Sequence, residues 1–144
     1  MNKLQQKMAR YGNLINDVMG RVEELQDKMS PQFEELRKAI DDDKLADIDA
    51  AHYEEIRKSF AEGTAEYGTL LGKFENADAP ARYIGNHKLL TKAFARFVDG
   101  CKDMTASLGA DKKIDVAAFN AAEKLQDEET GQLTKYLEKI QLIG

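Results

Sequence analysis

The stretch that decides the fold is YEEIRKSFAEGTAEYGTLLGKF, residues 53–74. Its apolar residues and one glycine recur at alternating spacings of three and four, at Tyr53, Ile56, Phe60, Gly63, Tyr67, Leu70 and Phe74. This spacing keeps one side of an α-helix facing a partner helix, as in coiled coils and helical bundles. The stretch is therefore predicted to form a long helix that packs lengthwise against others.

Three further stripes of the same kind run over residues 4–29, 83–108 and 116–140. Their members are Leu4, Met8, Tyr11, Ile15, Val18, Val22, Leu25 and Met29; Tyr83, His87, Leu90, Phe94, Phe97, Cys101, Met104 and Leu108; and Val116, Phe119, Ala122, Gln126, Thr130, Leu133, Leu137 and Ile140. Each stripe corresponds to a helix about 40 Å long. We expect an all-α fold, an elongated up-down-up-down four-helix bundle with coiled-coil-like heptad packing and a single domain over residues 1–144.

The boundaries of two helices carry local signals. Asp49 precedes the second stripe as an N-cap, with Ile48 before it and Tyr53 at the fourth helical position, the arrangement of a hydrophobic staple. Residues 114–119 repeat this pattern around Asp115. Between residues 30 and 47 the sequence favours a continuation of the first helix to about residue 41, kinked at Pro31, over a reversing turn.

Glycines interrupt the second stripe, and each lowers helix stability by about 1 kcal/mol relative to alanine. In an antiparallel hairpin around residues 76–80, Gly63 lies level with Phe94, and Gly72 lies level with Gly85, which predicts a close approach of the two helix backbones near the turn. Two interpretations follow for the middle of the bundle. Either aromatic rings fill the space beside the glycines, as close packing favours, or a pocket for a small apolar ligand is bordered by Gly63, Tyr67, Phe94, Phe97 and Thr130.

The two histidines were weighed as functional groups. His87 lies on the apolar stripe itself and is the candidate buried polar residue, hydrogen-bonded to a polar neighbour in preference to a ligand-contacting or pH-sensing role. His52 and His87 are about 27 Å apart in the expected hairpin, so they cannot share a metal ion. The single Cys101 lies two heptads from His87, which excludes a Cys–His dyad within that helix.

The sequence contains no complete metal-binding or catalytic motif. The only acid-x-x-His pair, Asp49 with His52, is better used as a helix cap than in a dimetal carboxylate site. The acidic segment at residues 41–49 lacks the glycine at the sixth position that an EF-hand loop requires. No nucleophile, base and orienting group can be placed together. We expect no cofactor, no metal site and no enzymatic activity.

The bulk composition restricts the kinds of partner. The net charge is −5 and the isoelectric point is about 5.1, which argues against nucleic acid as a partner. No run approaches the roughly 18 apolar residues of a membrane span, so no integral membrane segment is expected. One cysteine and the absence of an apolar signal core favour the cytoplasm, while a cell-surface or secreted location after signal removal stays open.

Two functions from different classes are consistent with this pattern. The preferred hypothesis is a non-catalytic helical-bundle module that engages a protein partner or self-associates, because the seam-like spacing of the first helix extends beyond its neighbours. The alternative is a small apolar-ligand binding protein with a mid-bundle pocket near Phe94. The discriminating question is whether the middle of the bundle is filled or hollow.

Overall fold

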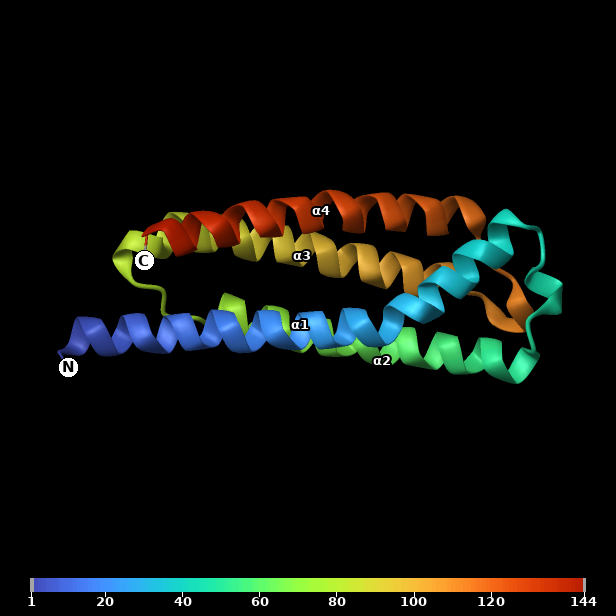
Figure 1. Cartoon of the computed structure of the whole chain (residues 1–144), viewed down its shortest axis with the longest axis horizontal. Coiled ribbons are helices and arrows are strands. Elements are labelled where there is room, and N and C mark those ends of the chain that lie inside the picture. The colour runs from blue at the N-terminus through green and yellow to red at the C-terminus, as the bar shows by residue number, and fades with distance from the viewer. Residues whose placement is uncertain (1, 144) are drawn as a thin grey trace.

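The computed structural model describes residues 2–143 and shows four long helices lying side by side (Figure 1). The helices are α1 (Lys3–Asp41), α2 (Ala50–Glu75), α3 (Ile84–Ser107) and α4 (Val116–Ile143). Short 3-10 turns lie in the connections: η1 (Leu45–Asp47), η2 (Ala81–Tyr83) and η3 (Ala110–Lys112). α1 runs through Pro31 to Asp41, which confirms the continuation of the first helix.

The apolar stripes form the buried faces of the helices. All seven members of the 53–74 stripe are buried, and so are all eight members of the 83–108 stripe. α1 buries its stripe from Tyr11 to Leu25, whereas Leu4 at its beginning is largely exposed. The spacing thus identifies the inward face of α2, whereas α3 is buried over a wider face that also includes Ala93, Val98, Gly100 and Ser107.

The two expected helix caps are confirmed. The Asp49 side chain accepts a hydrogen bond from the backbone N–H of His52 at 3.2 Å, and Asp115 accepts one from the N–H of Ala118 at 3.0 Å. α1 has a cap that the sequence analysis missed. There, the Asn2 side chain accepts from the N–H of Gln5 while the Gln5 side chain accepts from the N–H of Asn2, a capping box.

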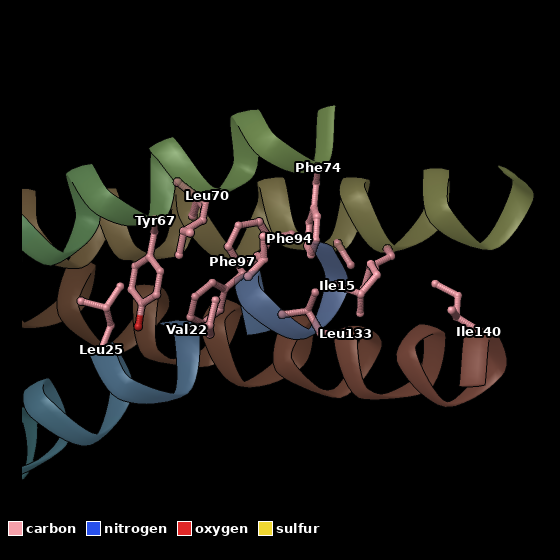
Figure 2. Close-up of a cluster of buried hydrophobic side chains, with 14 of the residues drawn as sticks. Ile15, Val22, Leu25, Tyr67, Leu70, Phe74, Phe94, Phe97, Leu133 and Ile140 are labelled. Atoms are coloured by element: carbon pink, nitrogen blue, oxygen red, sulfur yellow. The ribbon is translucent and has the colours of Figure 1, made fainter. Parts of the chain in front are cut away.

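The apolar core is divided into two clusters along the bundle. One surrounds Phe94 (Figure 2) and occupies the half that contains both chain ends, which Figure 1 marks. The other surrounds Phe119 and includes Leu36, Tyr53 and Ile56. Met29 is only partly buried and packs against both clusters. The boundary between the clusters therefore lies near the middle of the bundle.

The glycines do not have the neighbours that the hairpin alignment predicts. A Cβ placed on Gly63 would lie 2.5 Å from Sδ of Met29, so it is α1, and not Phe94, that fills this space. Gly68, Gly72 and Gly85 have no atom within 4 Å of such a Cβ, so the predicted close approach at Gly72 and Gly85 is wrong. The helix alignment was wrong because α2 and α3 are shifted along each other: the hydroxyl of Thr64, next to Gly63, lies 3.0 Å from that of Thr105, well beyond Phe94 along α3.

The close helix approach lies elsewhere, at Gly100 on α3. A Cβ there would lie 2.9 Å from Cγ of Gln126 and 3.4 Å from its backbone nitrogen. The Gln126 amide also donates a hydrogen bond to the Gly100 carbonyl at 3.1 Å. This glycine allows α4 to pack closely on α3 beside the middle of the bundle.

Candidate functional site

A cavity of about 310 Å³ lies at the boundary between the two core clusters. All four helices contribute to it. The buried part of its wall is apolar and aromatic, formed by Phe60, Tyr67, Phe97, Cys101 and Met104, with the partly buried Met29 and Phe33 beside them. The bundle therefore contains a hollow region at mid-length with a lining suited to an apolar molecule.

The mouth of the cavity is polar and opens between α1 and α4. Gln26 and Ser30 on α1, and Asp127 and Thr130 on α4, line the cavity and are exposed to solvent. The remaining polar members, Thr64, Thr105, Glu123 and Gln126, are half-buried. A small molecule could enter from solvent at this rim without unfolding of the bundle.

Beyond the cavity, α1 and α4 are joined again. The Arg37 guanidinium donates to the Glu123 carboxylate at 3.0 Å and to the Asn120 side chain at 2.7 Å. The rings of Phe33 and Phe119 stack with their centroids 5.6 Å apart. These contacts join α1 and α4 on the side of the cavity nearer the η1 and η3 turns.

Most polar groups in the wall already have partners within the protein. The hydroxyls of Thr64 and Thr105 lie 3.0 Å apart, and the Thr105 hydroxyl donates to the Cys101 carbonyl at 2.9 Å. The amide of Gln126 is engaged with Gly100. These side chains hold α2, α3 and α4 together at the cavity and have little hydrogen-bonding capacity left for a ligand.

Tyr67 is the exception. Its side chain extends from α2 with the hydroxyl at the tip farthest from that helix (Figure 2). The residue is only 2% exposed, yet no residue within 2–143 forms a hydrogen bond with this hydroxyl. Because every fully enclosed side-chain nitrogen or oxygen in that range has a partner, the hydroxyl has to reach the open space of the cavity. Burial raises the pKa of Tyr67, so the phenol keeps its proton and can donate it in a hydrogen bond.

Cys101 also lies in the cavity wall. Burial raises the pKa of its thiol to about 12, so the thiolate that would act as a nucleophile is scarce at neutral pH. Neither His52 nor His87 lines the cavity. The cavity therefore presents binding groups, and none of its residues forms a pair of nucleophile and base.

The predicted pocket residues are partly brought together. Tyr67, Phe97 and Thr130 line the cavity, whereas Gly63 and Phe94 do not. Phe94 is fully buried in the neighbouring core cluster, where its ring contacts those of Phe74 and Phe97 at centroid distances of 5.4 and 6.0 Å. Phe94 was misplaced because the predicted alignment of α2 with α3 was shifted: Phe94 lies against Phe74, near the end of α2, while Thr64, next to Gly63, lies against Thr105.

Thr130 reaches the cavity from the rim and not from the buried face of α4. The buried residue at this level is Glu129, which is 5% exposed and pairs with Nε of Arg96 on α3 at 3.0 Å. Glu129 was not predicted to be buried, because the stripe of α4 was traced only through apolar and uncharged residues. A strict spacing of three and four through Phe119, Ala122 and Gln126 leads to residue 129 and is the signal that could have identified it.

His87 lies in the core, away from the cavity. Its Nε2 lies 2.9 Å from the Phe74 carbonyl, which can only accept, so Nε2 carries the proton and Nδ1 accepts from the Tyr11 hydroxyl at 2.9 Å. Both ring nitrogens of this buried histidine therefore have partners. This arrangement corresponds to the structural interpretation of His87.

Within residues 2–143, no group of three or more histidine, cysteine or acidic side chains is arranged to hold a metal ion. Asp49 is used as the cap of α2, as described above. None of the helices in this range combines the length and the apolar character needed to cross a bilayer. Comparison with known proteins finds no matching protein family, no matching curated protein and no matching solved structure. The chemistry of the cavity is therefore inferred from its own residues.

Proposed function

We propose that this protein binds a small, mainly apolar molecule in the mid-bundle cavity. The observation that carries the proposal is the cavity itself, with its buried wall of aromatic and sulfur-containing side chains and its exposed polar rim. Protein interiors are close-packed and have few voids larger than a water molecule. A volume of about 310 Å³ is near the lower end of the range of small-molecule sites, roughly 300–1,000 Å³.

The architecture proposed from the sequence explains why the cavity is there. In an up-down-up-down bundle with heptad packing, α1 and α4 are neighbours, and the cavity lining that these two helices share supports this order. Pro31 lacks the N–H that would bond to the Asp27 carbonyl, which favours a bend in α1. The α1 ribbon changes direction in its last third (Figure 1). We infer that this bend parts α1 from α4 beside Ser30 and leaves the mouth open.

A direct test uses a neutral aromatic probe, 1-naphthylmethanol, in isothermal titration calorimetry. Ser30→Trp places a large ring at the exposed rim, and the expected result is loss of measurable binding. Asn16→Trp, at an exposed position of α1 outside the cavity, is the matched control and should bind like the wild type. Because the natural chain has no tryptophan, each variant also carries its own fluorescence reporter.

Two outcomes would overturn the proposal. Absence of binding to the wild type would indicate that the cavity does not accept an apolar ring of this size. Equal binding to Ser30→Trp and the wild type would show that the probe binds elsewhere. Native mass spectrometry of freshly purified protein adds an independent measurement, since a natural apolar ligand should appear as a mass shift that Ser30→Trp removes.

A second candidate function is self-association through the end of the bundle that contains both chain ends. Leu4 is 60% exposed and Leu142 is 87% exposed, and Figure 1 places the beginning of α1 and the end of α4 at this same end. We propose a second copy of the chain as the partner. Sedimentation equilibrium should then show a concentration-dependent dimer that Leu142→Lys weakens, whereas Val116→Lys, at the opposite end, leaves it unchanged.

A further inference from the structure

The charged side chains in the cavity lining are of one sign. Asp127 and Glu123 contribute carboxylates to the lining, and no lysine, arginine or histidine lines it among the residues that the structure describes. A ligand with a negative charge would find no cationic group in the lining and would be repelled by Asp127 at the rim. A ligand with a positive charge would find complementary groups there.

The two carboxylates are not equivalent. Glu123 is already paired with Arg37, so its charge is largely compensated. Asp127 forms no ion pair or hydrogen bond with any residue in 2–143. Lys124, three residues earlier in α4, pairs instead with Glu128, with 3.9 Å between its Nζ and the Glu128 carboxylate. The uncompensated charge of the cavity is therefore that of Asp127.

The buried wall offers a second anchor. Tyr67 lines the cavity with a hydroxyl that has no hydrogen-bond partner in the described part of the chain and is not fully enclosed, in a buried wall otherwise formed by rings and by the sulfur atoms of Met29, Met104 and Cys101. Aromatic and thioether groups pack well against aromatic or aliphatic ligands. A hydroxyl in such surroundings gains more from a hydrogen-bond acceptor on the ligand than it would in water.

We propose that the cavity is a site for lipophilic amines, in which an apolar ring system lies against Phe97 and Met104, the protonated amine meets Asp127 at the rim, and an acceptor on the ring system bonds to the Tyr67 hydroxyl. This inference rests on the proposed function, because it specifies the ligand class of the same cavity. It assigns opposite ends of the ligand to two residues on different helices.

The test compares three probes with one ring system and different charges: 1-naphthylmethylamine, 1-naphthylmethanol and 1-naphthoate. Calorimetry at pH 7 and low salt should give an affinity for the amine about tenfold higher than for the alcohol, and no measurable binding of the carboxylate. Asp127→Asn should reduce amine affinity to that of the alcohol and leave alcohol affinity unchanged. Glu128→Gln, which removes a charge from the next position outside the cavity, is the matched control and should change neither.

A second comparison tests the Tyr67 anchor. The probe is 2-acetylnaphthalene, whose carbonyl is an acceptor, and its reference is naphthalene itself. The wild type should bind the ketone several-fold more tightly than naphthalene, and Tyr67→Phe should abolish that difference while keeping naphthalene affinity.

The outcomes separate this inference from the proposed function. If none of the naphthalene probes binds, both fail. If the neutral probes bind and the amine binds no better, the amine class fails and the cavity site stands. If the amine binds better but Asp127→Asn and Glu128→Gln weaken it equally, the attraction comes from the overall net charge and the assignment to Asp127 is overturned. A ketone preference that persists in Tyr67→Phe overturns the role of the hydroxyl.

Discussion

The Tyr11 hydroxyl donates a hydrogen bond to Nδ1 of His87 at 2.9 Å, and this contact ties α1 to α3 inside the core. Tyr67 on α2 is buried to a similar extent, but its hydroxyl has no hydrogen-bond partner among residues 2–143. Two tyrosines of the same core thus differ in one property, whether the hydroxyl is satisfied by the protein. This difference provides a matched test of the first prediction.

Tyr11→Phe should lower the free energy of unfolding by about 1–3 kcal/mol, because it leaves Nδ1 of His87 buried without a donor. Tyr67→Phe should change the free energy of unfolding by less than about 0.5 kcal/mol, because it removes no protein hydrogen bond. Urea denaturation followed by circular dichroism measures both. A large loss for Tyr67→Phe would mean that its hydroxyl is bonded inside the free protein.

The same substitution at two glycines of α2 should have opposite effects. Displacement of the flexible end of Met29 is inexpensive by itself, but the whole Leu side chain of Gly63→Leu has to fit at a buried position between α2 and α1, so the free energy of unfolding should fall by about 1–3 kcal/mol. Gly68→Leu enters open space and should raise it by up to about 1 kcal/mol through helix propensity. Thermal denaturation distinguishes the two, and a stabilised Gly63→Leu would contradict the packing of α1 on α2.

His52 should make stability depend on pH. Its Nε2 lies 2.7 Å from the Glu35 carboxylate, and this hydrogen bond, with the charge of Glu35, raises the pKa of His52 above its ordinary value. The stabilisation is therefore fully present below the unfolded-state pKa of about 6.5 and is lost as pH rises through the folded-state pKa. Urea midpoints measured between pH 5.5 and 8.5 should fall with pH, and His52→Gln should remove that component. If the urea midpoints of the wild type and His52→Gln changed with pH in the same way, the contribution of His52 would be excluded.

The buried carboxylate of Glu129 should depend on its arginine. Arg96→Gln leaves Glu129 without its cationic partner and should lower the free energy of unfolding by about 1–3 kcal/mol. Lys92→Gln, one turn earlier on α3 at an exposed position, removes the same charge and should have an effect near zero. Equal effects would indicate that net charge, and not the Arg96–Glu129 pair, determines the result.

The thiol of Cys101 should report on the cavity. Its pKa of about 12, against an ordinary value of 9.0, makes the thiolate roughly a thousandfold scarcer at pH 8 than in the unfolded chain. Alkylation by iodoacetamide, followed by mass spectrometry, should therefore be slow in the native protein and fast in denaturant. Saturation with 1-naphthylmethanol should slow it further, and an unchanged rate would place the probe away from Cys101.

Local features of this protein follow from the sequence alone. The spacing over residues 53–74 predicted which side of α2 is buried, since the position of a side chain around a helix depends only on its number along the chain. The caps at Asp49 and Asp115 were predictable for a similar reason, because a capping side chain bonds to a backbone group three residues away. The continuation of α1 past Pro31 was also preferred from its apolar pattern.

The relations between helices required the tertiary structure. The partner of Gly63, the burial of Glu129 in place of Thr130, and the unpartnered hydroxyl of Tyr67 all depend on how far each helix is shifted and rotated against its neighbours. Heptad spacing leaves that alignment undetermined, because the same apolar pattern recurs about every two turns, so a helix shifted by one repeat presents a similar face to its neighbour. The alignment is decided by the combined volumes of side chains from several helices at once, and the cavity lies where those volumes fail to fill the space between α1 and α4.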